Sequence, residues 1–331
     1  RIPSCRQALR PLCSARIACV KVVPIREAFD RAGMMAMADP FILLDDARDG
    51  AGVGARLFES PREVFRALRP DEVAETLAAA EAAQADRGGT LAGYIAYEAG
   101  LALEPKLRPL ADARTGAAGP LVWLGLFENE QAISADEVEE WLATRAPGAA
   151  SLGPLEPAIS LGQWEAQFAQ LQQAIAAGDI YQANLTMRAR GRWSGDLRAL
   201  FARLVTTQPV GHAAWLDLGT HQVLSLSPEL FLERRGMRLT CRPMKGTAPR
   251  GANRNVDAEI AAELARDPKS QAENVMIVDL MRNDLSRIAV PGSVKVPRLF
   301  EVEPYATLFQ MTSTVEGEVP SETGFAACMR E

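Results

Sequence analysis

The chain has 331 residues, of which 48% are hydrophobic and 24% are charged. This composition can bury a sizeable core, so it excludes a disordered tail, a collagen-like repeat and a small disulfide scaffold, and no apolar run approaches the roughly 18 residues of a membrane span. The net charge of -6, with 36 Lys and Arg against 42 Asp and Glu and no basic stripe, disfavours nucleic acid and anionic membrane as partners.

The first 26 residues have an unusual composition, with basic residues and no acidic one. Such a segment is typical of a transit peptide or of translated sequence upstream of the true start, and we favour the second interpretation. Three methionines, Met34, Met35 and Met37, stand just before the first expected strand. We therefore expect residues 1–36 to be a non-native or disordered extension.

Residues 37–150 predict an α+β subdomain. The segment Asp71–Gln84, rich in Ala and Glu, predicts a helix that Gly88-Gly89 ends. The stretch 147–157, rich in Gly, Pro and Ala, is the expected linker. Strands are predicted at 41–44, 55–58, 91–98 and 121–127.

Residues 156–331 form the expected second domain. Gln163–Ala177 predicts an amphipathic helix ended by Gly178, and further helices are predicted at 258–266 and 270–285. No βαβ alternation with GxGxxG occurs, so the pattern predicts an α+β fold with large antiparallel sheets flanked by helices. The predicted strands are 180–188, 213–218, 223–226, 230–234, 239–243, 293–296 and 312–315. A final helix after Ser321 reaches Glu331 without a C-cap, which indicates a fragment.

The residue types narrow the possible chemistry. Two histidines, His212 and His221, argue against a multi-histidine zinc site and a Ser-His-Asp enzyme. Five cysteines without a CxxC motif suit a reducing compartment, so we expect a cytoplasmic protein. Chemistry should therefore rest on carboxylates, a lysine or a hard metal ion.

The segment from Ser227 to Thr247 predicts a β-hairpin that concentrates the candidate chemistry. A turn at Arg235-Gly236-Met237 places Glu229 and Lys245 opposite each other, or within a residue or two. Together they could act as an acid and a nucleophile, because burial can lower the pKa of a lysine until its amine is neutral. The alternative is a simple cross-strand ion pair.

The helix predicted near 271–285 is apolar enough to be buried on most sides, yet it carries several charged residues. Buried acids are costly unless they are paired or bound to metal. Glu273 and Asp284 share a face, where a hard ion such as Mg²⁺ would suit one or two carboxylates. The alternative is an internal network of Arg282 with Asp279 and Asp284 that locks the helix.

Several stretches resemble motifs of the chorismate-utilising enzymes, and together they span most of residues 156–320. The four that carry the resemblance are Gly178–Leu185, Ser227–Glu229, Arg242–Thr247 and Ala272–Asp284. Further matches are Gly292–Pro297, Glu303-Pro304 and Ser313-Thr314, with weaker ones at Leu57–Ser60 and Tyr94–Glu98. The resemblance implies that family's fold, incomplete at the C-terminus because the family continues with a Gly-rich segment and a further metal-binding glutamate.

Within this family the sequence is most similar to the aminodeoxychorismate synthase branch, component I. That branch replaces the 4-hydroxyl group of chorismate with an amino group on the route to 4-aminobenzoate and folate. Lys245 matches the lysine of its P-x-K-G-T motif, where anthranilate synthases carry a small residue. Gln182 lies where isochorismate and salicylate synthases are expected to carry a water-activating lysine, so ammonia is the favoured nucleophile.

The resemblance also implies roles for individual residues. Lys245 would attack C2 of chorismate while Glu229 protonates the leaving 4-hydroxyl group, after which ammonia would add at C4 and expel the lysine. Glu273 would be one carboxylate ligand of Mg²⁺. The residues expected to contact substrate are Gly246, Thr247 and Gln182, and Ser60 marks a possible regulatory site for an aromatic amino acid.

Ammonia would come from a separate glutamine amidotransferase subunit, since the sequence shows no Cys-His-Glu glutaminase pattern. Two alternatives stay open at this point. One is anthranilate synthase component I, and the other is a non-catalytic, truncated remnant that only binds a partner or a ligand.

Overall fold

The computed structural model describes residues 15–18, 39–48, 54–113, 119–145 and 148–330 of the chain. Antiparallel sheets dominate, and helices lie beside them, so the predicted α+β class is confirmed. The chain divides into two compact units, of which the first combines residues 1–138 with 205–331 and the second is Glu139–Leu204. No helix among the described residues combines the length and apolar character that crossing a bilayer requires.

A five-stranded antiparallel sheet in the first unit joins strands from distant parts of the sequence. Its order is β13 (Gln222–Ser227), β12 (His212–Asp217), β2 (Phe41–Asp45), β3 (Ala55–Glu59) and β7 (Gln131–Ile133). Because β12 pairs with β2, the two domains expected from the sequence share this sheet. The predicted strands 41–44, 55–58, 213–218 and 223–226 are confirmed.

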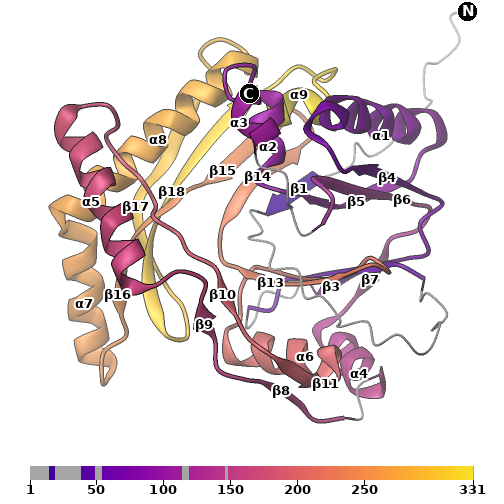
Figure 1. Cartoon of the computed structure of the whole chain (residues 1–331), viewed down its shortest axis with the longest axis horizontal. Helices are drawn as coiled ribbons and strands as arrows, with labels where there is room; N and C mark the ends of the chain where they lie inside the picture. Colours follow the sequence, from indigo (N-terminus) through magenta and orange to yellow (C-terminus); the bar gives the residue numbers. More distant parts are fainter. Residues whose placement is uncertain (1–14, 19–38, 49–53, 114–118, 146–147, 331) are drawn as a thin grey trace, which may run out of the picture. The chain divides into compact units, whose positions relative to one another are not determined.

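A three-stranded sheet packs against the five-stranded one. Its order is β4 (Glu63–Ala67), β6 (Val122–Phe127) and β5 (Thr90–Ile95). The core between the two sheets contains Ile42, Phe58, Trp123, Phe127 and Leu216, all at most 2% exposed. The other face is covered by helix α1 (Val73–Arg87) through Val73, Leu77 and Ala80 (Figure 1).

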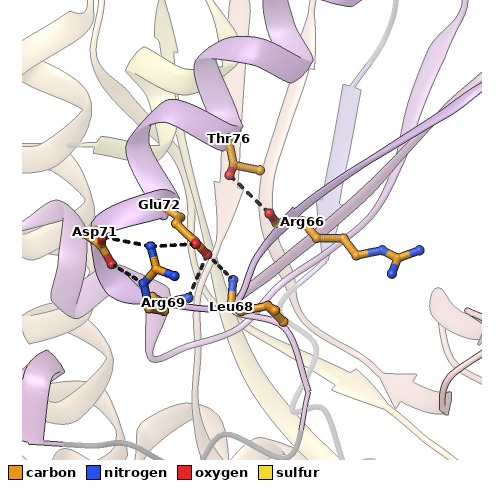
Figure 2. A network of polar contacts seen from close by, with 6 residues as sticks. All are labelled: Arg66, Leu68, Arg69, Asp71, Glu72 and Thr76. Carbon is orange, nitrogen blue, oxygen red and sulfur yellow. Dashed lines mark hydrogen bonds and ion pairs between the residues drawn. The ribbon is translucent and has the colours of Figure 1, made fainter.

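The start of α1 is fixed by a polar network (Figure 2). A short 3₁₀ turn, η1 (Pro70–Glu72), leads into the helix. The Glu72 carboxylate accepts hydrogen bonds from the backbone N–H groups of Leu68 and Arg69 at 2.8 and 3.0 Å. The Arg69 guanidinium pairs with the carboxylates of Asp71 and Glu72. This network supplies hydrogen-bond partners near the helix start, and the predicted helix 71–84 is confirmed.

The short helices α2 (Ala99–Leu103) and α3 (Arg108–Ala113) follow β5.

The third sheet of the first unit has six strands and carries the candidate site. At one edge β1 (Ala15–Ala18) pairs with β14 (Leu230–Arg235), which pairs with β15 (Arg238–Arg242). Two segments, β15 and then β16 (Met244–Pro249), run along one edge of the long strand β18 (Leu308–Glu318), and Pro243 separates them. The opposite edge of β18 pairs with β17 (Lys295–Pro304).

Two helices cover one face of the six-stranded sheet (Figure 1). Helix α8 (Pro268–Ile288) packs Val278 and Leu285 against Leu239 and Val315, and helix α7 (Arg254–Arg266) packs Leu264 against Met311. The predicted helices 258–266 and 270–285 are therefore confirmed. The last helix is α9 (Phe325–Arg330).

The second unit contains α5 (Leu161–Ala177) and two small two-stranded ladders. Ser160 caps α5 together with Gln163, and Gly178 ends it with a φ of 81°, as the sequence predicts. The strand predicted at 180–188 is wrong, since only the pair Ala189–Arg190 (β10) is a strand, paired with β9 (Glu156–Pro157). The other ladder joins β8 (Ala150–Leu152) and β11 (Trp193–Gly195), and α4 (Ala135–Arg145) and α6 (Leu197–Thr207) flank this unit in sequence.

Most of the expected N-terminal extension lies outside the described residues. Its described part, β1, pairs Ala15 with Arg234 and Ala18 with Leu230 at the edge of the six-stranded sheet. The domain boundaries proposed at 37–150 and 156–331 stay predictions.

Candidate active site

The predicted hairpin forms around Gly236. Strands β14 and β15 pair Arg235 with Arg238 and Leu230 with Arg242, and Gly236 has a φ of 61°. A positive φ is a conformation that glycine adopts without a steric cost, which explains the glycine at this turn. The open end of the hairpin lies between Glu229 and Pro243.

Lys245 lies in a β-bulge between β16 and β18. Met244 pairs with Thr312 and Thr247 with Gln310, so two residues, Lys245 and Gly246, lie opposite the single residue Met311. Bulges of this kind redirect a side chain and are frequent beside active sites. The bulge thus breaks the regular alternation of side chains at the predicted nucleophile.

Gly246 is required by the geometry of this bulge. Its φ is 96°, and a Cβ atom placed on it would lie 2.8 Å from the Cβ of Ser270 and 3.2 Å from the Cβ of Met311. Both the backbone conformation and the close approach of α8 therefore exclude a larger residue without rearrangement.

Glu229 reaches the same strand from the other side of the hairpin. One oxygen of its carboxylate accepts a hydrogen bond from the backbone N–H of Met244 at 3.3 Å. The Ser227 hydroxyl accepts from the Glu229 N–H at 3.2 Å and so orders the turn before β14. The structure therefore brings the predicted acid to the residue directly before the predicted nucleophile.

A polar network lies on β15, β17 and β18 near the same end of the sheet. The guanidinium of Arg242 pairs with the carboxylate of Glu303, which also accepts hydrogen bonds from the Thr312 hydroxyl at 3.0 Å and the Tyr305 hydroxyl at 3.1 Å. Burial, with the charge of Glu303, raises the pKa of Tyr305 above its usual value. Nε of Arg242 and the hydroxyl of Thr314 are buried without a hydrogen-bond partner among the described residues.

Arg242 and Glu303 both lie within the sequence motifs, but the motifs alone indicate a role for neither. The motif spacing could not indicate their contact, because the ion pair crosses β18.

Glu273 lies on α8, with 35% of its side chain exposed and its carboxylate 3.5 Å from Nζ of Lys269. No three His, Cys, Asp or Glu side chains gather into a metal site within the described part of the chain. Since Mg²⁺ usually takes one or two carboxylates and completes its shell with water and substrate oxygens, Glu273 fits as one such ligand. The residues described do not form a closed metal cage.

The prediction that this helix is buried on most sides is wrong. Only one stripe of α8 is buried, through Asn274, Val278 and Leu285. Val275 and Leu280 are 45% and 41% exposed. Within the expected locking network, Arg282 lies 3.3 Å from Asp279, and both of these side chains are more than half exposed.

The three other predicted site residues, Thr247, Gln182 and Ser60, lie in three different parts of the chain. The Thr247 hydroxyl donates to the side-chain oxygen of Gln310 at 3.1 Å, which keeps it beside the bulge. Gln182 lies in the irregular segment after α5, within the second unit. Ser60 directly follows β3 and has a φ of 51°. Its backbone N–H donates to the carbonyl of Pro40 at 3.2 Å, and its hydroxyl contacts the Asp39 carboxylate at 3.4 Å.

Asn274 lies within the motif Ala272–Asp284, and the sequence indicated no role for it. It is fully buried on α8, and its side-chain amide donates to the carbonyl oxygens of Lys245 and Met311. The available signal was its position: Asn274 is a polar residue four positions before Val278, on the same apolar stripe of the predicted helix.

Comparison with protein families matches residues 39–331 to the model described as chorismate binding enzyme. Aminodeoxychorismate synthase component 1 of Klebsiella aerogenes is 41% identical over 172 residues, which is 52% of this chain and 38% of that protein. The Escherichia coli protein of the same name is 42% identical over 160 residues, or 48% of this chain and 35% of that protein. Anthranilate synthase component 1 of Aeropyrum pernix is 34% identical over 188 residues, or 57% and 43%. The matched region thus spans less than half the length of each of these relatives.

Solved structures share the fold. A putative 2,3-dihydroxybenzoate-specific isochorismate synthase from Bacillus anthracis superposes with a TM-score of 0.64 at 16% identity, over 89% of this chain and 72% of that one. Anthranilate synthase component I from Streptococcus pneumoniae gives a TM-score of 0.60 at 20% identity, over 100% of this chain and 75% of that one. The fold predicted from the sequence motifs is therefore confirmed.

Proposed function

Because the chain belongs to the family of chorismate binding enzymes, we propose that it carries the catalytic residues of an aminodeoxychorismate synthase component 1. The reaction would replace the 4-hydroxyl group of chorismate with an amino group, for 4-aminobenzoate and folate synthesis in the cytoplasm. The main support for the proposal is the hydrogen bond from the backbone N–H of Met244 to the Glu229 carboxylate, because Met244 directly precedes Lys245 in the bulge.

The proposed mechanism has two displacement steps, in which Lys245 first displaces the 4-hydroxyl group and ammonia then displaces Lys245. The neutral amine of Lys245 forms a bond to C2 of chorismate, the ring double bonds shift, and the C4–O bond breaks while Glu229 gives its proton to the leaving oxygen, which departs as water. Ammonia then bonds to C4, the double bonds shift back, and the C2–N bond to Lys245 breaks. A general acid is needed because hydroxide is a poor leaving group, and the covalent intermediate divides a difficult substitution into two easier steps.

Mg²⁺ is the expected cofactor, and Glu273 would hold it together with oxygens of the substrate. The ion would neutralise a carboxylate of the bound chorismate. Gly246 and Thr247 would contact the substrate from β16, where the glycine lets the chain pass close to α8. Gln182 stays a proposed substrate contact, with an amide in place of a lysine that would activate water.

A glutamine amidotransferase subunit is the proposed partner, since its release of ammonia would supply the second nucleophile. The names of the relatives, which designate a component 1, support this proposal. Ser60 and its contact to Asp39 mark the proposed regulatory site for an aromatic amino acid.

The decisive assay incubates the protein with chorismate, MgCl₂ and ammonium sulfate at mildly alkaline pH and identifies the product by mass spectrometry. The proposal expects 4-amino-4-deoxychorismate, no product with Lys245→Ala, and full activity with the matched control Lys295→Ala, a lysine on the exposed part of β17. Anthranilate as the product would instead support the alternative function of an anthranilate synthase component 1, a class that also contains relatives of this chain.

A further inference from the structure

We propose that Asn274 is a positioning residue that locks the bulge at Lys245 and Gly246 and so fixes the direction of the lysine side chain. The inference rests on the proposed role of Lys245. Asn274 contacts neither the amine of Lys245 nor the substrate. The proposed role is therefore to position Lys245, in addition to packing α8 against the sheet.

The burial of Asn274 is the first observation. Its side chain is 0% exposed, in a helix stripe that is otherwise filled by Val278 and Leu285. An amide in such a place is tolerated only when its donors and acceptor are paired. An apolar residue would fill the stripe without that requirement, so the pairs themselves explain the presence of the amide.

The partners of Asn274 lie on both strands of the bulge. Its Nδ2 atom donates to the carbonyl of Lys245 at 3.4 Å and to the carbonyl of Met311 at 3.3 Å. Met311 is the single residue opposite the two bulged residues. A bulge disturbs the regular ladder at this point, and the side chain of Asn274 supplies hydrogen bonds on both strands there.

The acceptor side of Asn274 extends the lock to a third strand. Its Oδ1 atom accepts a hydrogen bond from the Ser313 hydroxyl at 2.6 Å, and the same hydroxyl accepts from the backbone N–H of Phe300 at 3.1 Å. Phe300 has a φ of 59°, and β17 shifts its register beside it. One amide therefore connects α8 to β16, β18 and β17.

Asn274 also follows Glu273 directly. Successive residues of a helix point about 100° apart, so the amide is directed into the sheet while the carboxylate of Glu273 is partly exposed. The same helical turn thereby holds the proposed metal ligand and the backbone of the proposed nucleophile. A shift of a catalytic group by about 1 Å can reduce the rate about 100-fold. The hydrogen bonds of Asn274 would hold the backbone of Lys245 to within such a distance.

The test uses Asn274→Asp in the full chain, because the carboxylate has the same shape but offers no donor to the two carbonyls. Asn283→Asp is the matched control, since Asn283 lies on the same helix with an exposed side chain. The first readout is the rate at which trinitrobenzenesulfonate labels each lysine, measured by peptide mass spectrometry. The second is the kcat and KM for chorismate amination with ammonia.

We expect Asn274→Asp to change the labelling rate of Lys245 while Lys106 and Lys295 keep their wild-type rates. We expect kcat to fall about 100-fold with little change in the KM for chorismate. Asn283→Asp should match the wild type in both readouts. Ser313→Ala leaves both hydrogen bonds donated by Asn274 in place and removes the hydroxyl that donates to Oδ1 of Asn274 and accepts from the Phe300 N–H, so it should give a smaller change in the same direction.

The proposal would be overturned by a wild-type labelling rate of Lys245 in Asn274→Asp. An equal rise in the labelling of every lysine would instead show that this variant has lost its fold. If Asn274→Asp does not fold, the Ser313→Ala comparison decides by the same criteria. If the wild type does not aminate chorismate, the proposed function fails by that result alone, and the labelling comparison still decides whether Asn274 holds Lys245.

Discussion

The Glu229 carboxylate accepts a hydrogen bond from the backbone N–H of Met244 at 3.3 Å, although the two residues lie 15 positions apart. The hairpin turn at Gly236 returns the chain, and after the break at Pro243 the following strand, β16, continues along the same edge of β18 as β15. An acidic side chain thus contacts the backbone next to a lysine in a bulge. This arrangement is the structural basis of the proposed acid and nucleophile.

Replacing Glu229 with glutamine separates its chemical role from its structural one. The amide side chain would keep an oxygen that can accept the Met244 N–H but would lose the proton that the leaving group needs. We expect Glu229→Gln to keep the wild-type melting temperature and to lower kcat by about 10² to 10⁴-fold. Glu233→Gln, on the same strand, should keep full activity, and equal losses in both variants would contradict the role of Glu229.

Replacing Glu273 tests the proposed metal ligand. We expect Glu273→Gln to require a higher Mg²⁺ concentration for the rise in melting temperature that chorismate produces. Lys269→Ala, which removes the partly exposed ion pair with Glu273, should lower the required concentration by at most about fivefold. Asp279→Asn serves as the control because its side chain is 78% exposed on the same helix. An unchanged Mg²⁺ dependence in Glu273→Gln would exclude it as a ligand.

The hairpin was predictable from local sequence, whereas the bulge was not. Gly236 marks the turn through a backbone conformation that glycine adopts freely, so neighbouring residues suffice to locate it. The bulge depends on the register of β16 against Gln310 and Thr312, far along the chain, and on the closeness of Ser270. Register and helix contacts of this kind arise from tertiary packing, which local patterns do not encode.

Two other expectations failed for related reasons. Residues 180–188 are suited to a strand by composition, yet a strand also needs a neighbour to pair with, and only Ala189–Arg190 has one. The apolar residues of α8 suggested burial on most sides, but Val275 and Leu280 are partly exposed. The sheet can contact only one stripe of a helix, so apolar content alone overestimated the burial.

Gly246 offers a stability test of the bulge. We expect Gly246→Ala to lower the free energy of unfolding, because a non-glycine residue at positive φ costs about 1–3 kcal/mol and its methyl group meets Ser270. Adding Ser270→Gly should relieve the contact but not the backbone cost, so recovery should be partial. Gly162→Ala is the control, since it lies in a helix with open space and should be neutral or stabilising. Urea unfolding measures all four proteins, and an unaltered stability in Gly246→Ala would contradict the geometry.

Asp45 gives the fold a pH dependence. Burial, together with the charge of Asp46, raises the pKa of the Asp45 carboxyl from 3.8 to about 6. The folded state then holds this proton more tightly than the unfolded state, so the contribution of Asp45 to the free energy of unfolding falls as pH rises from about 4 to about 6. We expect Asp45→Asn to remove this decline and to be more stable than the wild type at pH 7, by up to about 3 kcal/mol.

Urea unfolding between pH 4 and 7 measures the effect of Asp45→Asn. Asp86→Asn is the control, because Asp86 is exposed on α1 and does not contribute to the raised pKa of Asp45. Parallel pH profiles for Asp45→Asn and the wild type would show that the Asp45 pKa is the same in the folded and unfolded states.

The most direct test of the central claim is the mass of the Lys245 peptide after the protein is mixed with chorismate and Mg²⁺ without ammonia and quenched rapidly. We expect a covalent adduct on Lys245 whose added mass is that of chorismate less one water, and no adduct in Lys245→Ala. Its absence from Lys245 in a protein that forms 4-amino-4-deoxychorismate when ammonia is supplied would contradict the covalent mechanism.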